Sequence, residues 1–309
     1  MKLTIISTNT LIYLSTALFL ISFNSSAQDV SEKVIACNVA LDKGNTANAI
    51  VVSDEILQLE ANNRDGLLCK GRALGGQGKF EAALRALEVA AQQSKPGFEE
   101  IISTLLIGNL YKANNKNVEA IASYEKSLKV SEVEKNDKFS LINHNLMGET
   151  YTSNNDLNAA LASYIAGSKL TKNDNERADS FERLGVTYSA LGKHDLAIEY
   201  QLKGMLQQQK SGTLDQYANA SLALGKVYAN AKEYPQAEKV YTKLIQFAKE
   251  NGGAYYEAKA SYGLAQVAVA KGDSSNAKTM MGDALKIAKN TGDADLVLAI
   301  ETSINNLPN

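Results

Sequence analysis

Small residues recur along the chain at positions that suit close contacts between helices. In seven segments a small residue is followed twelve positions later by alanine. The small residues are Cys37, Gly71, Gly108, Gly148, Gly185, Gly225 and Ala265. The alanines are Ala49, Ala83, Ala120, Ala160, Ala197, Ala237 and Ala277. Self-similarity at this period predicts a solenoid of stacked helix pairs, with the small residues and alanines where helices cross.

Other positions of the pattern predict where the helices pack and end. Tyrosine lies three residues after the small position in four copies, at Tyr111, Tyr151, Tyr188 and Tyr228. Seven residues after it, six copies carry glycine or asparagine, which tolerate the left-handed conformation at a helix end. Lys232 is the exception, and Pro235 just beyond it suits the first turn of a helix. These tyrosines, and Tyr124, Tyr164 and Tyr241 on the second helices, are expected to fill the core rather than to form a ligand site.

The distance between successive small positions predicts unusually long helices. The spacings are 34, 37, 40, 37, 40 and 40 residues, and the extra residues all precede the first helix of the next copy. Three extra residues add nearly one helical turn, so longer helices explain the spacing better than longer loops. After the last copy, a turn over 290–293 and an amphipathic segment over 294–307 predict a helix that caps the open end.

The first residues of the chain predict export. The apolar run Leu11–Phe23 follows Lys2, and the small residues Ser25 and Ala27 come after it. This order is typical of a signal peptide, here cleaved after Ala27. The run is short for the roughly 20 residues that span a bilayer, although an uncleaved anchor is the alternative. We expect a periplasmic protein without membrane insertion after cleavage, and not a lipoprotein, because no cysteine lies at the predicted cleavage point.

Composition and motifs point away from catalysis. The 32 basic and 34 acidic residues give a net charge of -2, which predicts no affinity for nucleic acid. His144 and His194 are the two histidines, and neither falls at a spacing that builds a catalytic or metal site. No phosphate-binding loop or paired-cysteine motif occurs. We expect no enzyme activity, no cofactor and no metal.

Cys37 and Cys69 are the two cysteines of the chain. They lie on the first helices of adjacent copies, where they face somewhat different ways. An exported protein meets oxidising conditions, so a disulfide between them is possible. Two buried free thiols are the alternative, and the sequence leaves both open.

The repeats resemble the tetratricopeptide repeat over about residues 30–290. The clearest copy carries Leu184, Gly185, Tyr188, Gly192, Ala197 and Tyr200, and the next carries Leu224, Gly225, Tyr228, Ala237 and Tyr241. The resemblance implies an all-α, right-handed superhelical solenoid of seven antiparallel helix pairs. Its domains are a signal peptide (1–27), the solenoid (28–290), and a capping helix with a tail (291–309). The long repeats resemble those of bacterial peptide-binding regulators.

The resemblance also implies where a partner binds. In this family the first helix of each pair lines a concave groove, mainly from positions six and three before the small residue and one, four and five after it. The candidate partner-binding residues are Asn38, Arg72, Asn109, Glu149, Asn219, Lys226, Asn230, Tyr255, Tyr262 and Gln266. The lysine–asparagine carboxylate clamp of chaperone-binding members is absent, because Val34 precedes Asn38 and Leu105 precedes Asn109.

The function that this groove implies is binding rather than chemistry. We expect a non-enzymatic scaffold that holds an extended protein or peptide segment. A sensor of a peptide or small molecule that changes superhelix shape is the alternative, and a solvated face without a specific ligand is also open. Tyr255, Tyr262 and Gln266 on one helix, beside Lys226 on the preceding first helix, form the sharpest candidate site.

Overall fold

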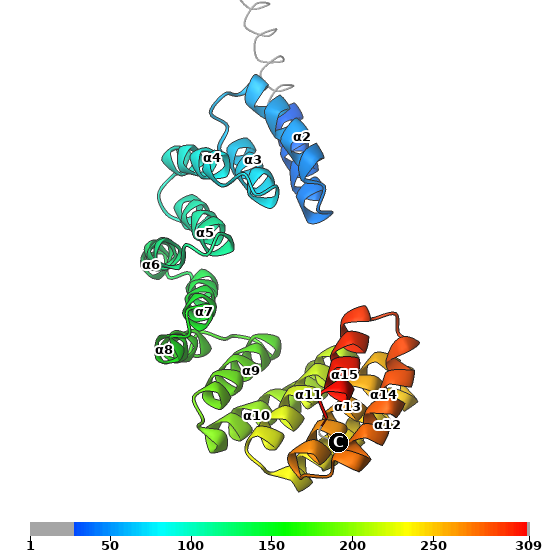
Figure 1. The fold of residues 1–309 in the computed structure, drawn as a ribbon. Helices are drawn as coiled ribbons and strands as arrows, with labels where there is room; N and C mark the ends of the chain where they lie inside the picture. The colour runs from blue at the N-terminus through cyan, green and yellow to red at the C-terminus, as the bar shows by residue number, and fades with distance from the viewer. Residues whose placement is uncertain (1–27, 308–309) are drawn as a thin grey trace, which may run out of the picture. The chain divides into compact units, whose positions relative to one another are not determined.

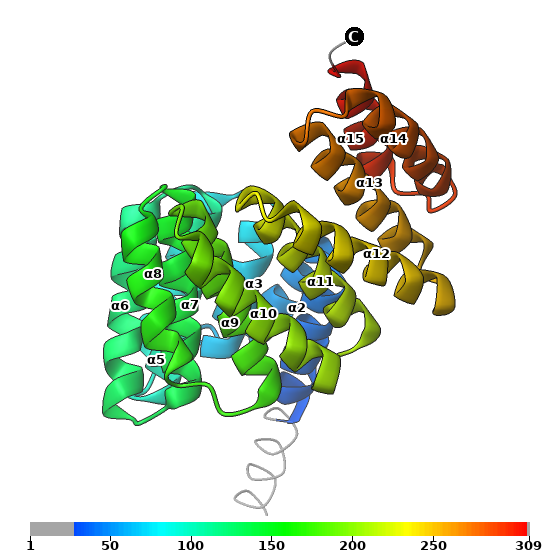
Figure 2. The same ribbon diagram turned by 90° about the horizontal axis from the view of Figure 1, so that it is seen from below.

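The computed structural model describes residues 28–307, and the predicted signal peptide lies outside them. Helices joined by short connections make up this part of the chain, which contains no strand (Figures 1 and 2). The all-α prediction is confirmed. A first helix covers residues 28–42. The others are α2 (Thr46–Leu59), α3 (Arg64–Gly76), α4 (Phe80–Gln93), α5 (Phe98–Ala113), α6 (Asn117–Val133), α7 (Asp137–Ser153), α8 (Leu157–Ser168), α9 (Asp174–Ala190), α10 (His194–Ser211), α11 (Leu214–Asn230), α12 (Tyr234–Glu250), α13 (Ala254–Ala270), α14 (Ser274–Lys289) and α15 (Ala294–Asn305).

Close packing explains the small residues of the repeat. The seven repeat alanines are all fully buried, with 0% of their surface exposed. The small position opposes a larger side chain sixteen residues later, on the second helix of the pair. A Cβ added to Gly71 would lie 2.6 Å from Leu87, and one added to Gly225 would lie 2.6 Å from Tyr241. Glycine therefore makes room for the side chain that fills each crossing.

Each predicted helix end adopts the left-handed conformation. The residues seven after the small position, Gly44, Gly78, Asn115, Asn155, Gly192, Lys232 and Gly272, have φ between 57° and 86°. Lys232 shares this conformation (φ 62°), although its side chain disfavours it. The amide of Glu233 still bonds the Tyr228 carbonyl at 2.9 Å, as at the other ends. The repeat geometry therefore imposes the conformation even where the sequence lacks the usual residue.

Helix length accounts for the long spacing of the later repeats. Helix α3 contains Gly71, which ends the 34-residue spacing, and it has 13 residues. Helices α9, α11 and α13 have 17 residues each. Helix α8 is shorter, at 12 residues, and the connection over 169–173 follows it. None of the helices within residues 28–307 is long and apolar enough to cross a membrane.

The helices group into two compact units that divide between Thr150 and Tyr151, near the end of α7. The sequence predicted one continuous solenoid over 28–290. We call the described part of the first the N-terminal unit (28–150) and that of the second the C-terminal unit (151–307). In the C-terminal unit, α15 packs Ile300 and Leu296 against α13 and α14. The expected capping helix is thus present.

A disulfide joins Cys37, in the first helix, to Cys69 in α3. Their Cα atoms are 6.4 Å apart and both side chains are buried. Around the bond, Val30, Ala40 and Ile56 form the apolar core of this end of the chain. Of the two arrangements that the sequence left open, the structure therefore has the disulfide and not the two free thiols.

Candidate functional site

A groove of about 870 Å³ crosses the C-terminal unit. Three first helices of successive pairs, α9, α11 and α13, line it together with α15. Gln208 of α10 and Tyr241 of α12 reach it from the second helices. An adjoining hollow of about 500 Å³ shares Lys226, Tyr241, Gly263 and Gln266 with it, so the two form one continuous groove. We call this surface the C-terminal groove.

The predicted register places its lining residues. Positions six and three before the small residue and one after it contribute Asp179, Glu182, Asn219, Leu222, Lys226, Lys259, Tyr262 and Gln266. The structure thus brings together all the candidate residues from the last two repeats. Asn219, Lys226, Tyr255, Tyr262 and Gln266 line the larger part, and Asn230 lines the adjoining hollow.

Several polar groups in the walls bond to neighbouring residues. Tyr262 shares a hydrogen bond with Ser303 of α15, which ties the capping helix to α13. The Asn219 amide donates to the Tyr256 hydroxyl at 3.3 Å. Lys259 donates to the Tyr255 hydroxyl at 2.9 Å and lies 4.8 Å from the centre of that ring. These hydrogen bonds hold the side chains of the walls, including the rings of Tyr255 and Tyr262, in their positions.

Tyr241 forms the centre of the groove floor. Its ring lies between two glycines of neighbouring helices, because a Cβ on either Gly225 or Gly263 would come within 2.6 Å of the ring. The side chain is only 5% exposed, and burial raises the pKa of its hydroxyl to about 12. The hydroxyl makes no hydrogen bond to another residue within 28–307.

Other polar groups of the groove also have no partner in the described part of the chain. Lys226 and Gln266 form no ion pair or hydrogen bond there. Gln208 is 8% exposed, and its Oε1 is buried without a donor. A buried polar group that lacks a partner is costly unless a ligand or water satisfies it. Because Gln208 Oε1 is closed off from solvent, the unpaired groups that a ligand can reach are those of Tyr241, Lys226 and Gln266.

The groove carries more acidic than basic groups. Its charged lining residues are Asp179, Glu182, Asp293, Asp295, Lys226 and Lys259. Asp179 pairs with Arg183 at 2.8 Å. Desolvation by the groove walls, and then the Asp179 charge, raise the pKa of the Glu182 carboxyl, although solvent still reaches its side chain. A cationic group of a ligand would favour the charged form of Glu182.

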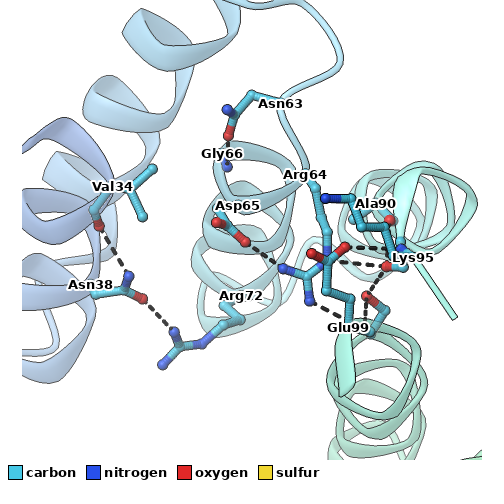
Figure 3. A network of polar contacts seen from close by, with 12 residues as sticks. Val34, Asn38, Asn63, Arg64, Asp65, Gly66, Arg72, Ala90, Lys95 and Glu99 are labelled. Carbon is cyan, nitrogen blue, oxygen red and sulfur yellow. Dashed lines mark hydrogen bonds and ion pairs between the residues drawn. The ribbon is translucent and has the colours of Figure 1, made fainter. Parts of the chain in front are cut away.

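The remaining candidate residues lie in the N-terminal unit, where each has a partner. Figure 3 shows Arg72 donating to Asn38 at 2.9 Å, while the Asn38 amide donates to the Val34 carbonyl at 3.0 Å. Asn109 accepts from the Tyr124 hydroxyl at 2.8 Å, and Lys112 pairs with Glu149. A hollow of about 300 Å³ includes Arg72 and Asn109. The sequence placed these residues in a groove but did not foresee that they pair.

The sequence pattern did not identify two residues of the groove floor, Tyr241 and Gln208, as candidate binding residues. Tyr241 was assigned to core packing, and its ring does pack in the core, but its hydroxyl also lines the groove. Gln208 carried no motif. A signal for Tyr241 exists in hindsight, because glycines at 225 and 263 flank it on the two helices against which it packs.

The histidines lie away from the groove. His194 is exposed at the start of α10, and His144 is half-buried in α7, where burial lowers its pKa. No group of three His, Cys, Asp or Glu side chains within residues 28–307 could hold a metal ion.

Comparison with known proteins identifies the repeat. Models of the tetratricopeptide repeat match residues 176–250, 216–290 and 105–133. Tetratricopeptide repeats are therefore present over residues 105–133 and 176–290. No curated protein matches its sequence.

Solved structures share the tetratricopeptide-repeat fold at low sequence identity. The apo form of the quorum sensor NprR from B. thuringiensis is 17% identical, with a TM-score of 0.63 over 96% of this chain and 89% of that one. The C-terminal part of a tetratricopeptide-repeat protein from Cytophaga hutchinsonii is 14% identical, with a TM-score of 0.62 over 85% and 98%. Apo RapI is 14% identical, with a TM-score of 0.56 over 78% and 96%. At these identities the likeness concerns the fold.

Proposed function

We propose that this tetratricopeptide-repeat protein is a non-enzymatic scaffold that holds an extended peptide or protein segment in its C-terminal groove. One observation carries the proposal: Tyr241, Lys226 and Gln266 line the continuous groove, and none of their polar groups has a partner within residues 28–307. An extended peptide backbone presents both N–H and C=O groups along its length. A peptide can therefore bond to the Tyr241 hydroxyl and to the Gln266 amide at once.

The walls of the groove suit the side chains of such a segment. Leu222, Leu296 and the rings of Tyr255 and Tyr262 line it beside the amide of Asn219. Apolar and aromatic surface with a few placed polar groups is the usual character of a binding site. Tyrosines contribute large contact areas at low cost in side-chain entropy.

A second candidate function is sensing, in which a bound peptide or small molecule changes the shape of the superhelix. The fold of the quorum sensor NprR resembles that of this protein over nearly the whole chain, and this likeness favours the second candidate. Small-angle scattering with and without a bound peptide separates the two functions. A sensor changes its dimensions when the peptide binds, whereas a rigid scaffold keeps them.

We also propose that the protein is exported to the periplasm and that its signal peptide is removed after Ala27. The sequence of residues 1–27 supports this, and the Cys37–Cys69 bond suits an oxidising compartment. Mass spectrometry of the mature protein should give an N-terminus at Gln28. An N-terminus at Met1 in the membrane fraction would overturn the proposal.

The binding proposal can be tested by panning a phage-displayed library of random peptides on purified protein that begins at residue 28. Selected peptides should lose most of their affinity for the Tyr262→Ala/Lys226→Ala variant. Because Tyr262 also anchors α15, Tyr262→Phe/Lys226→Met provides a second variant that keeps the ring. Thermal melting checks that both variants fold.

A matched control exists outside the groove. Tyr234 is half-buried and donates to the Ala270 carbonyl at 3.5 Å, much as Tyr262 donates to the Ala299 carbonyl at 3.5 Å. Lys278 is exposed on α14. The Tyr234→Ala/Lys278→Ala variant should therefore keep full affinity. Equal affinity of the groove variants and the control would refute the proposal.

A further inference from the structure

We infer that Tyr241 and Lys226 form a subsite for a carboxylate of the ligand at the centre of the C-terminal groove. The inference rests on the proposed peptide-binding function and deepens it, because it names the group that the centre of the groove recognises. Both residues line the larger hollow and the adjoining one, so the subsite lies where the two meet.

The position of the Tyr241 hydroxyl follows from the packing of its ring. The Cζ atom, which bears the hydroxyl, is the ring atom nearest to Gly263 and is as near to Gly225 as Cε1 is. The hydroxyl therefore emerges between α11 and α13. Lys226 directly follows Gly225, and Gln266 lies three residues after Gly263 on the facing helix. Tyr241, Lys226 and Gln266 all line both hollows, so a hydroxyl, an ammonium group and an amide open onto the same space.

The same position in the N-terminal unit shows what this arrangement lacks. There, Tyr124 packs against Gly108 as Tyr241 packs against Gly225. The residue after Gly108 is Asn109, whose oxygen accepts the Tyr124 hydroxyl proton at 2.8 Å. The residue after Gly225 is Lys226, and an ammonium group has no lone pair with which to accept. An internal acceptor has been replaced by a second donor.

Two neighbouring donors without an acceptor call for an acceptor from outside the chain. At neutral pH the Tyr241 hydroxyl keeps its proton, since its pKa of about 12 lies far above that pH. A carboxylate can accept from both groups, and hydrogen bonds to a charged acceptor are the stronger kind. A neutral carbonyl would satisfy the tyrosine but would leave the ammonium charge of Lys226 without a counterion.

The charges that line the groove indicate that a carboxylate would be held by hydrogen bonds to Tyr241 and Lys226 and not by a general attraction of anions to the groove. Four acidic side chains and two lysines line the larger hollow, and Lys259 already contacts Tyr255. The groove therefore repels polyanions overall. A carboxylate gains binding energy only at the point where Tyr241 and Lys226 both reach it.

Acetate serves as the first probe, because it carries the carboxylate alone. Sodium acetate is titrated into the protein labelled with ¹³C in its tyrosine rings, and sodium chloride at equal ionic strength is the control. The Tyr241 signal, assigned with Tyr241→Phe, should shift with acetate in the wild type and not in Lys226→Met. Tyr124 should not respond, since Asn109 already accepts its proton.

Peptides identify the source of the carboxylate. Peptides selected on the groove are made with a free C-terminus, with an amidated C-terminus, and amidated with an internal glutamate. One of the two carboxylate-bearing forms should bind about tenfold more tightly than the plain amide. This ratio of dissociation constants corresponds to a difference of about 1.4 kcal/mol in binding free energy. Preference for the free acid identifies a C-terminal carboxylate, and preference for the glutamate form a side-chain carboxylate.

Two single-residue variants make the result decisive. Tyr241→Phe removes only an oxygen and keeps the ring between the two glycines, and Lys226→Met keeps most of the side-chain length. Each should abolish the preference for a carboxylate, while Tyr124→Phe and Lys278→Met should retain it. If both groove variants keep the preference, or if the amide binds equally well and acetate has no effect, the subsite is refuted although peptide binding stands. If acetate shifts Tyr241 but no peptide binds, the subsite stands and the scaffold function fails.

Discussion

The two units use the same repeat position in opposite ways. In the N-terminal unit, the residues one after the small position are Asn38, Arg72, Asn109 and Glu149, and each bonds to another side chain of that unit. In the C-terminal unit they are Val186, Lys226 and Gln266. Neither of the latter two polar residues has a partner within 28–307.

The polar residues at this position therefore bond to other side chains in the N-terminal unit and stay without a described partner in the C-terminal unit. The two units share the helix register, the buried alanines and the glycine–tyrosine crossings. The residue types beside the crossings differ, so the shared repeat pattern alone does not decide where a partner binds. The hollow between α3 and α5 measures about 300 Å³, against about 870 Å³ for the C-terminal groove. The binding proposed for the C-terminal groove thus rests on a few residue differences within a shared repeat pattern.

The largest effect that should distinguish the units comes from the disulfide. Cys37 and Cys69 are 32 residues apart, and a loop of this length predicts that reduction costs about 3–4 kcal/mol. The loss should fall on the first helix and α3, because no cysteine lies elsewhere in the chain. Hydrogen exchange should accelerate over 28–76 on reduction and stay unchanged over 174–307.

The Cys37→Ala/Cys69→Ala variant controls for the reductant itself, since its exchange should not respond. Thiol titration of the denatured, unreduced wild type should find no free thiol. Two free thiols, or equal exchange over 28–76 in the oxidised and reduced protein, would show that the bond does not constrain the N-terminal unit.

A smaller effect should come from filling the floor of the C-terminal groove. In Gly263→Ala the new Cβ would lie 2.6 Å from the Tyr241 ring, which cannot retreat because Gly225 lies on its other side. Overpacking costs typically about 1–3 kcal/mol, and the gain in helix propensity offsets up to about 1 kcal/mol. We therefore expect a net loss of about 1–2 kcal/mol in denaturant unfolding.

Gly282 is the matched control for this substitution. It lies inside α14, with no atom within 4 Å of an added Cβ. Gly282→Ala should therefore stabilise the protein by about 0.5–1 kcal/mol through helix propensity alone. If both variants proved more stable than the wild type, Tyr241 would not be held between the glycines.

The fold could be predicted from the sequence because its constraints repeat. A glycine beside Tyr124 and one beside Tyr241 obey the same packing rule, and repetition makes such a rule visible in a single chain. The left-handed helix ends followed for the same reason, and even Lys232 conforms. The division into two units did not follow, since the copies on either side of Thr150 carry the same repeat pattern.

The site could be predicted only in part. Register placed Lys226 and Tyr262 in the groove, because position along a first helix decides which face a side chain occupies. Register could not reveal pairing, which depends on two residues from different helices at once. Asn109 was therefore predicted to bind a partner, although it accepts a hydrogen bond from Tyr124. Tyr241 was predicted to pack in the core, although its hydroxyl has no partner within residues 28–307.

The smallest and most direct test compares the two tyrosine hydroxyls. Tyr124→Phe removes the hydroxyl that donates to the half-buried Asn109, so the free energy of unfolding should fall by about 1 kcal/mol. Tyr241→Phe removes a hydroxyl that bonds to no described residue, and the free energy of unfolding should stay within about 0.5 kcal/mol of the wild type. Burial raises the pKa of both tyrosines, so neither result should vary between pH 6 and 8. Urea unfolding of the variants without ligand measures both values. Equal losses in the free energy of unfolding would mean that Tyr241 has an internal partner. The contrast between the paired polar residues of the N-terminal unit and the unpaired ones of the C-terminal unit would then fail.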